Sequence, residues 1–327
     1  MPVLIRRRLS RENSQGMMTE AAMERHIPSH SDFPESHPPA RSGSALLPQC
    51  GNVKCRSGWM KLWRSRQSPV LEGKWACSEA CMEEIVLTAV LREAGELNAH
   101  SAQKAAHQHR VPLGLVLLSR GVITQEQLRK ALEAQRKAGQ GRLGEWLIRQ
   151  NAADEEQVTR ALSAQWNCPV LTAAPHDRAL MASAFPRLLI DSAGAVPLRL
   201  AGRELLYVAF EDKIDRCLVL AVEQMLGLKV EAGVLRESDF RRVQQDALRA
   251  SFPKTRLLEA ASMRGLVHAI TAMIEERKAV RSQIVRVHDY YWLRIWRNPP
   301  VTGDRRVLPA VEDVEDLVCS IAASAIG

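Results

Sequence analysis

Four cysteines in the first quarter of the chain are the residues whose type and spacing point most directly to chemistry. Cys50 and Cys55 form one close pair, and Cys77 and Cys81 form another. In a reducing compartment, pairs of this kind more often hold zinc than form disulfides. Four thiolates would fill a tetrahedral site and leave no position for a catalytic water, so we expect structural zinc. Two pairs of buried, reduced thiols are the alternative.

The segment that carries these cysteines, residues 46–84, is too short to be stable through a hydrophobic core alone, and a bound metal would supply the missing stability. Trp59, Trp63 and Trp75 are interleaved there with lysines and arginines. Such a composition suits single-stranded nucleic acid, through base stacking and phosphate contacts. We favour the other interpretation, in which the tryptophans form the core of a small zinc module and the cations form its solvated rim.

Between residues 110 and 165, a pattern of leucine, glycine and glutamine occurs twice with a constant offset of 30 residues. Each copy predicts a short helix, a turn and a second helix that opens with a capping box, Thr124 with Gln127 and Asp154 with Gln157. Two such hairpins should pack as a four-helix unit. The equivalent positions are Leu113 and Leu143, Gly114 and Gly144, Leu117 and Leu147, Leu118 and Ile148, Gly121 and Asn151, Val122 and Ala152, Ile123 and Ala153, and Gln135 and Gln165.

The remaining segments predict an α+β protein of several domains. We expect a disordered leader over residues 1–45, which are rich in proline and serine, and a connecting helix over residues 85–109. Residues 166–250 predict a small α+β subdomain with a strand hairpin, a helix, a third strand and a last helix. Residues 256–327 predict a C-terminal α+β unit with a helix, aromatic strands and a closing helix over 311–325.

The formal net charge is +8, and residues 1–75 hold 12 lysines and arginines against six aspartates and glutamates. This basic segment suits an anionic partner, or it is simply a solvated tail. No apolar run is long enough to span a membrane, and no apolar stretch follows the first arginines as in a secretory signal. We therefore expect a cytoplasmic protein.

The motifs of several common enzyme classes are missing from the sequence. The patterns G-x4-G-K-[S/T], G-x-S-x-G and H-E-x-x-H do not occur. His288 falls in an aromatic strand, where a structural histidine is expected rather than a general base. Because no nucleophile or acid–base constellation stands out, we expect that the chain is not an enzyme.

The doubled pattern and the hairpin–helix–strand–helix after it resemble the amino-terminal (MshEN-type) domain of type II secretion and type IV pilus assembly ATPases, over about residues 110–250. The resemblance implies docking to a secretion or pilus ATPase or platform protein and, for a subset of the family, binding of cyclic di-GMP. The ATPase domain itself has no counterpart here. The ligand-binding residues implied are Leu113, Gly114, Leu117, Leu118, Gly121, Val122, Ile123 and Gln135 in the first copy, and Arg142, Leu143, Gly144, Leu147, Ile148, Asn151 and Gln165 in the second.

Both copies depart from the family pattern. Pro112 stands where the first arginine is expected, although Arg110 lies two residues upstream, and Asn151 replaces a glycine. Arg142 remains, and a guanidinium can bond the guanine edge and attract phosphate. We expect a regulatory or adaptor protein that binds cyclic di-GMP. The alternatives are a ligand-free docking subunit and a nucleic-acid-binding protein that acts through its tryptophan- and cysteine-containing segment.

Overall fold

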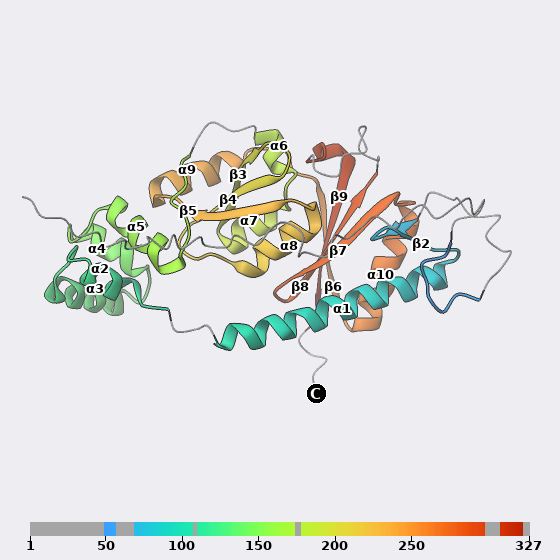
Figure 1. Ribbon diagram of the computed structural model, residues 1–327, viewed down its shortest axis with the longest axis horizontal. Coiled ribbons are helices and arrows are strands. Elements are labelled where there is room, and N and C mark those ends of the chain that lie inside the picture. The colour runs from blue at the N-terminus through green and yellow to red at the C-terminus, as the bar shows by residue number, and fades with distance from the viewer. Residues whose placement is uncertain (1–48, 57–68, 107–109, 174–177, 298–307, 323–327) are drawn as a thin grey trace, which may run out of the picture. The chain divides into compact units, whose positions relative to one another are not determined.

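The computed structural model describes five stretches of the chain, and their fold is α+β (Figure 1). The predicted leader, Trp59 and Trp63 lie outside these stretches. Within them, no helix combines the length and apolar character that crossing a bilayer requires. The described residues are 49–56, 69–106, 110–173, 178–297 and 308–322.

The tandem repeat folds as four helices, and its turns follow the predicted local chemistry. Both predicted capping boxes are confirmed, at the starts of the second and fourth helices. The turn residues Gly121 and Asn151 have positive φ values of 67° and 53°. Asparagine tolerates this left-handed backbone better than most residues, which explains why it can replace glycine there. The helices are α2 (Leu113–Ser119), α3 (Gln125–Ala138), α4 (Leu143–Arg149) and α5 (Glu155–Trp166).

The two copies of the repeat interlock rather than stand side by side. Helix α2 of the first copy packs against α5 of the second, and α3 packs against α4. A Cβ atom at Gly114 would lie 3.2 Å from a methyl group of Leu143, and one at Gly144 would lie 3.8 Å from a methyl group of Leu113. The two glycines therefore sit where the copies meet, and a Cβ atom at Gly114 would crowd Leu128 of its own copy and Leu143 of the other.

Residues 178–247 form a small layer of helices around a three-stranded sheet. The sheet order is β3-β4-β5, with β3 and β4 antiparallel and β4 and β5 parallel. The parallel pair is connected through helix α8, whose apolar face is buried. The elements are α6 (Arg178–Ala182), α7 (Arg187–Ala193), β3 (Ala195–Ala201), β4 (Leu205–Phe210), α8 (Arg216–Leu226), β5 (Lys229–Val234) and α9 (Glu237–Ala247).

The C-terminal residues form a four-stranded sheet of order β6-β9-β8-β7. The prediction of a closing helix over residues 311–325 was wrong, because Val314–Ile321 is strand β9, which lies between β6 and β8. Two acidic residues of this strand, Glu315 and Asp316, are fully buried in ion pairs with arginines. The elements are β6 (Lys254–Ala260), α10 (Met263–Glu276), β7 (Arg281–Val287), β8 (Tyr290–Trp296), the short 3-10 helix η2 (Val311–Asp313) and β9.

The cysteine-containing segment shares its core with this C-terminal sheet. It forms β1 (Val70–Leu71), β2 (Lys74–Trp75) and the long helix α1 (Glu79–Ala106), which packs against α10 and β7. The backbone of β1 continues the sheet, because Val70 N–H donates to the Ala279 carbonyl (2.8 Å) and Glu72 N–H donates to the Ser282 carbonyl (2.8 Å). Two segments about 200 residues apart in sequence thus build one hydrophobic core.

Polar contacts of Arg294 and His288 join the C-terminal sheet to the small α+β layer. Arg294 of β8 is fully buried, forms a bidentate pair with Asp316, and donates to the carbonyls of Ser183 and Ala184 after α6. His288 lies in the tight turn between β7 and β8, not within a strand as predicted, and its Nε2 is 2.5 Å from a carboxylate oxygen of Asp215, the residue that caps α8. These contacts fix the C-terminal unit against the small α+β layer.

Candidate functional site

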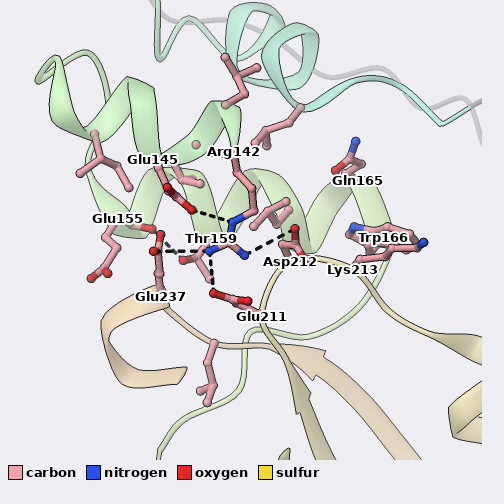
Figure 2. A pocket seen from close by; sticks show the side chains of 17 residues that line it. Arg142, Glu145, Glu155, Thr159, Gln165, Trp166, Glu211, Asp212, Lys213 and Glu237 are labelled. Atoms are coloured by element: carbon pink, nitrogen blue, oxygen red, sulfur yellow. Dashed lines mark hydrogen bonds and ion pairs between the residues drawn. The ribbon is translucent and has the colours of Figure 1, made fainter. Parts of the chain in front are cut away.

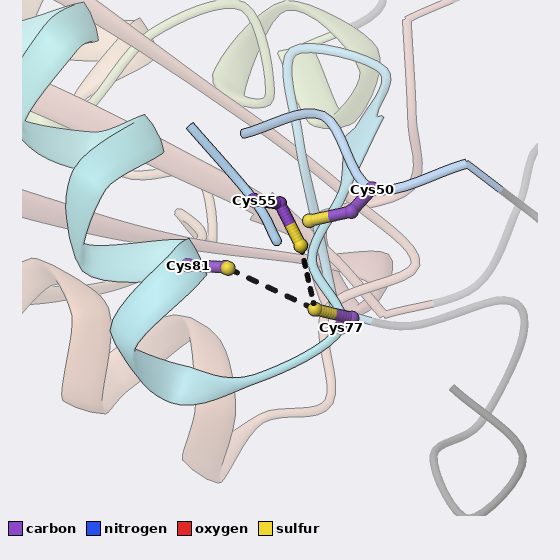
Figure 3. A group of neighbouring side chains, drawn as sticks. All are labelled: Cys50, Cys55, Cys77 and Cys81. Carbon is purple, nitrogen blue, oxygen red and sulfur yellow. Dashed lines mark hydrogen bonds between the residues drawn. The ribbon is translucent and has the colours of Figure 1, made fainter. Parts of the chain in front are cut away.

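The four paired cysteines converge on one point at the start of α1 (Figure 3). Cys50 and Cys55 come from the loop that precedes β1, Cys77 follows β2, and Cys81 lies in the first turn of α1. Their sulfur atoms all lie within 4.8 Å of one another. The structure therefore brings together every residue of the predicted metal site.

The sulfur spacing fits a tetrahedral metal centre. A Zn–S bond of about 2.3 Å implies sulfur atoms roughly 3.8 Å apart. The Cys55–Cys77 and Cys77–Cys81 pairs are 3.4 and 3.7 Å apart. Asn52 donates a hydrogen bond of 3.4 Å to the Cys81 sulfur, a contact that would orient a thiolate ligand. Burial raises the pKa of the Cys50 thiol to about 12, so a bound cation would be needed to hold it as a thiolate.

Trp75, the tryptophan of this segment that lies within the described stretches, is not available for stacking. Trp75 is 5% exposed and packs in the core that β1, β2 and α1 share with the C-terminal sheet. The sequence favoured a core position for this ring within a small separate module, but the core is shared with the C-terminal sheet. The nucleic-acid interpretation would therefore depend on residues outside the described stretches.

A pocket of about 300 Å³ lies where the tandem repeat meets the small α+β layer (Figure 2). Both copies of the repeat contribute to it. Its apolar wall includes Leu113 from the first copy and Leu143 and Ile148 from the second. The other lining residues are Arg142, Gly144, Glu145, Glu155, Val158, Thr159, Leu162, Gln165, Trp166, Glu211, Asp212, Lys213, Leu235 and Glu237.

Arg142 reaches across this pocket from the start of α4 to the α+β layer. Its Nε donates to Glu145 at 2.9 Å, and its Nη2 donates to Glu211 at 2.6 Å. Asp212 and Glu237 lie 3.5 and 3.4 Å from the guanidinium nitrogens. Figure 2 shows the four carboxylates around the guanidinium, an arrangement that we call the acid clamp.

The acid clamp determines the charge of the pocket. Burial alone would lower the pKa of Arg142, but its hydrogen bonds to Glu211 and Glu145 and the nearby Asp212 raise it above the usual value. The guanidinium is therefore a permanent cation. Five carboxylates and two cations line the pocket, a formal excess of three negative charges. An anionic ligand would have to displace carboxylates from Arg142 before the guanidinium could bind it.

A second contact ties the same two parts together. Glu155, at the start of α5, accepts hydrogen bonds of 2.7 Å from both the backbone N–H and the hydroxyl of Ser238 in α9. Glu237, the residue before Ser238, belongs to the acid clamp. The repeat and the α+β layer are thus connected by charged and polar groups around the pocket mouth.

The residues implied by the resemblance fall into three groups. Arg142, Leu143, Gly144, Ile148, Gln165 and Leu113 line the pocket. Leu117 and Leu147 are fully buried and form the centre of the repeat's own core, together with Ile123. The remaining residues do not line the pocket: Gly114 packs between helices, and Leu118, Gly121, Val122, Gln135 and Asn151 lie elsewhere on the repeat.

The sequence did not identify the carboxylates that surround Arg142. Glu211 and Asp212 follow strand β4 directly, and Glu237 opens α9, about 70 to 95 residues after the arginine. Residues that directly follow a strand commonly line binding sites. This position after β4 is the only feature of the sequence that could have suggested Glu211 and Asp212 as site residues. Nothing local marked Glu237 as their neighbour.

Comparison with known proteins identifies similarity to solved structures. No family model matches the chain, and no curated protein matches it. The structure of MshE with cdg is 26% identical, with a TM-score of 0.35, and the match covers 42% of this chain and 99% of that one. Two crystal forms of the XpsE N-terminal domain are 17% and 19% identical, with TM-scores of 0.32 and 0.25, and cover 41% and 39% of this chain and 91% and 89% of theirs. About two fifths of the chain is thus similar to MshEN-type amino-terminal domains.

Proposed function

We propose that this chain is a non-enzymatic regulatory adaptor whose tandem repeat binds cyclic di-GMP in the pocket beside Arg142. The observation that carries the proposal is that both copies of the repeat line one pocket, with a guanidinium in its wall. The repeated motif resembles that of domains in which a subset binds this dinucleotide, and one similar structure is of MshE with cdg.

The lining residues supply the chemistry that a guanine dinucleotide needs. Leu113, Leu143 and Ile148 offer apolar surface for purine faces. Once released from the acid clamp, Arg142 can donate two parallel hydrogen bonds to the edge of guanine, and its charge favours the phosphates. Because the carboxylates compete for the same guanidinium, the affinity should be modest.

Calorimetric titration of the full chain with cyclic di-GMP tests this function. The Arg142→Ala variant should lose binding and stay folded by circular dichroism. Arg136→Ala, which removes an exposed arginine of α3 outside the pocket, should bind like the unchanged protein. The proposal would be contradicted if the Arg142→Ala variant bound cyclic di-GMP as tightly as the unchanged protein does, or if the unchanged protein did not bind it.

A second candidate function is a docking subunit of a secretion or pilus machine that takes no small ligand. The acid clamp favours it, because four carboxylates already occupy the guanidinium and make the pocket negative. In this case Arg142 would serve to hold the repeat against the α+β layer. Co-purification with a secretion ATPase or platform protein, without any heat of binding for cyclic di-GMP, would support this candidate over the first.

The metal centre is proposed to hold structural zinc. Four sulfur donors at tetrahedral spacing are the ligand set that zinc prefers in closed sites, and they leave no coordination position for a substrate. Zinc there would fasten the loop before β1 to the first turn of α1. Such a thiol site is best maintained where thiols stay reduced, so we propose that the adaptor works in the cytoplasm.

A further inference from the structure

Glu315 of β9 is a buried carboxylate that contacts three arginines from different parts of the C-terminal unit. Its side chain is 0% exposed. The Nε atom of Arg256, a residue of β6, lies 3.1 Å from one carboxylate oxygen, and the Nη2 atom of Arg297, which follows β8, lies 2.6 Å from the other. Arg277, at the end of α10, donates to both oxygens, at 3.0 and 3.4 Å. One carboxylate therefore holds three guanidiniums together at this end of the sheet.

Arg277 alone is enough to neutralise the buried carboxylate, because its Nε and Nη2 atoms reach both oxygens. Burial would raise the pKa of Glu315, but hydrogen bonds from Arg297 and Arg277 hold it below its ordinary value, so the group is charged. Arg256 and Arg297 therefore exceed what Glu315 requires. In the described part of the chain, neither of these two arginines forms an ion pair with another carboxylate.

The two surplus guanidiniums are accessible from solvent. The side chains of Arg256 and Arg297 are 41% and 44% exposed. Arg297 donates to Glu315 through Nη2 alone, and its backbone N–H donates to the carbonyl of Asp313. Among the described residues, the terminal nitrogens of Arg256 and the Nε and Nη1 atoms of Arg297 form no hydrogen bond with protein. These N–H groups are open to a ligand.

The charge around Glu315 is positive. Lys254, the first residue of β6, is exposed and lies opposite Glu315 in the register, so its side chain is on the same face of the sheet. Glu276, which pairs with Arg277, adds a second carboxylate. Four cations and two carboxylates leave a formal excess of two positive charges. A phosphate monoester carries about −1.5 to −2 charges at pH 7, so it matches this excess better than a single carboxylate does.

We propose that Arg256 and Arg297 form a binding site for a phosphate monoester on the C-terminal sheet, with Glu315 as the buried group that positions them. A guanidinium binds phosphate oxygens through parallel hydrogen bonds. Because both guanidiniums are held on one carboxylate, they are placed to contact the same phosphate, and little further side-chain entropy is lost on binding. The site is separate from the proposed cyclic di-GMP site, since none of these residues lines the pocket of the repeat.

Two probes present this chemistry to the full chain from different sources. Phenyl phosphate is a free monoester, and its binding is measured by calorimetric titration. Phosphatidic acid is a lipid monoester, and its binding is measured by sedimentation with phosphatidylcholine vesicles that contain it. Arg256→Met and Arg297→Met should each weaken binding about tenfold, the effect of losing one charge-assisted hydrogen bond. Arg264→Met is the matched control, because Arg264 is an exposed residue in the first turn of α10, at the other end of that helix from Arg277.

Binding of phenyl phosphate that both arginine variants weaken would identify a free phosphate ester as the ligand, and the same dependence with vesicles alone would identify a lipid headgroup. The site is wrong if the unchanged protein binds neither probe, if both variants bind as tightly as it does, or if Arg264→Met weakens binding equally. Arg277 still neutralises Glu315 in both variants, and circular dichroism checks that they fold. Lys254→Met changes an exposed residue, should weaken binding about threefold, and decides the test if the arginine variants unfold.

Discussion

Gln135 and Gln165 make the same hydrogen bond from equivalent positions of the two repeat copies. The side-chain amide of Gln135 donates to the carbonyl of Gly141 at 2.8 Å, and that of Gln165 donates to the carbonyl of Val111 at 2.8 Å. These two carbonyl residues are themselves 30 positions apart, each just before the first residue of a copy. The last helix of each copy therefore holds the start of the other, which explains why the motif occurs as a pair.

Removing one of these amides should loosen the repeat without touching its core. Gln165→Ala is expected to lower the free energy of unfolding by about 1 kcal/mol, the usual value of such a hydrogen bond. Urea unfolding measures the change. Gln125→Ala, at an exposed position of α3 that makes no such bond, should leave stability within about 0.5 kcal/mol. Equal stability of the two variants would show that the amide contact does not hold the copies together.

Weakening the acid clamp should strengthen ligand binding. Glu237→Gln removes one negative charge near Arg142 and keeps the shape of the side chain, so cyclic di-GMP should bind about fivefold more tightly. Calorimetry gives the affinities. Glu133→Gln is the control, since that exposed carboxylate pairs with Arg129 on α3 and does not line the pocket. Weaker binding by the Glu237→Gln variant would mean that the carboxylates help to hold the ligand.

The local structure of the repeat could be predicted from sequence because its determinants are local. Capping boxes need two residues three positions apart, and the left-handed turn at Asn151 needs one residue of suitable type. The cysteine cluster was also predictable, because two close pairs at metal-ligand spacing leave few other interpretations.

The acid clamp and strand β9 could not be predicted in the same way. Glu211 and Glu237 meet Arg142 only after the repeat docks on the α+β layer, so no local pattern reveals them. In β9, Glu315 and Asp316 are charged residues of the kind that occur on the solvated face of a helix. In the structure they lie inside the protein, because arginines from other elements pair with them. Burial of paired charges is a tertiary property, and a polarity pattern cannot report it.

The metal centre should be needed for stability of the N-terminal segment. Purified protein is expected to contain about one equivalent of zinc, and chelation should lower the thermal unfolding midpoint by roughly 5 °C or more. Elemental analysis measures the zinc content, and differential scanning calorimetry measures the unfolding midpoint. Cys81→Ala should lose the metal, whereas Cys168→Ala, which lies outside the cluster, should keep it. Metal-free protein with an unchanged midpoint would contradict a structural role.

The contact between Asp215 and His288 should make stability depend on pH. Burial would raise the pKa of Asp215, but the hydrogen bond and charge of His288 and the N–H groups of Cys217 and Leu218 hold it below its ordinary value. Because the carboxyl pKa is lower in the folded state, the ionised group stabilises the folded protein at pH values above the unfolded-state pKa of about 3.9. This stabilisation is lost as the pH falls through the pKa of the folded state.

The Asp215→Asn variant isolates this contribution, because asparagine still caps a helix but carries no charge. At pH 6 it should be less stable than the unchanged protein by about 1 kcal/mol in urea unfolding. The difference should shrink as pH falls below about 4. A difference that stays constant down to pH 3 would assign the effect to packing rather than to charge.

Both copies of the repeat should contact a single bound ligand. Methyl-labelled leucine NMR of the full chain, titrated with cyclic di-GMP, tests it most directly. The methyl signals of Leu113 and Leu143 should shift together, with one shared binding curve, while that of the exposed Leu257 on β6 should not move. Unmoved signals for both leucines, or a shift confined to one copy, would contradict it.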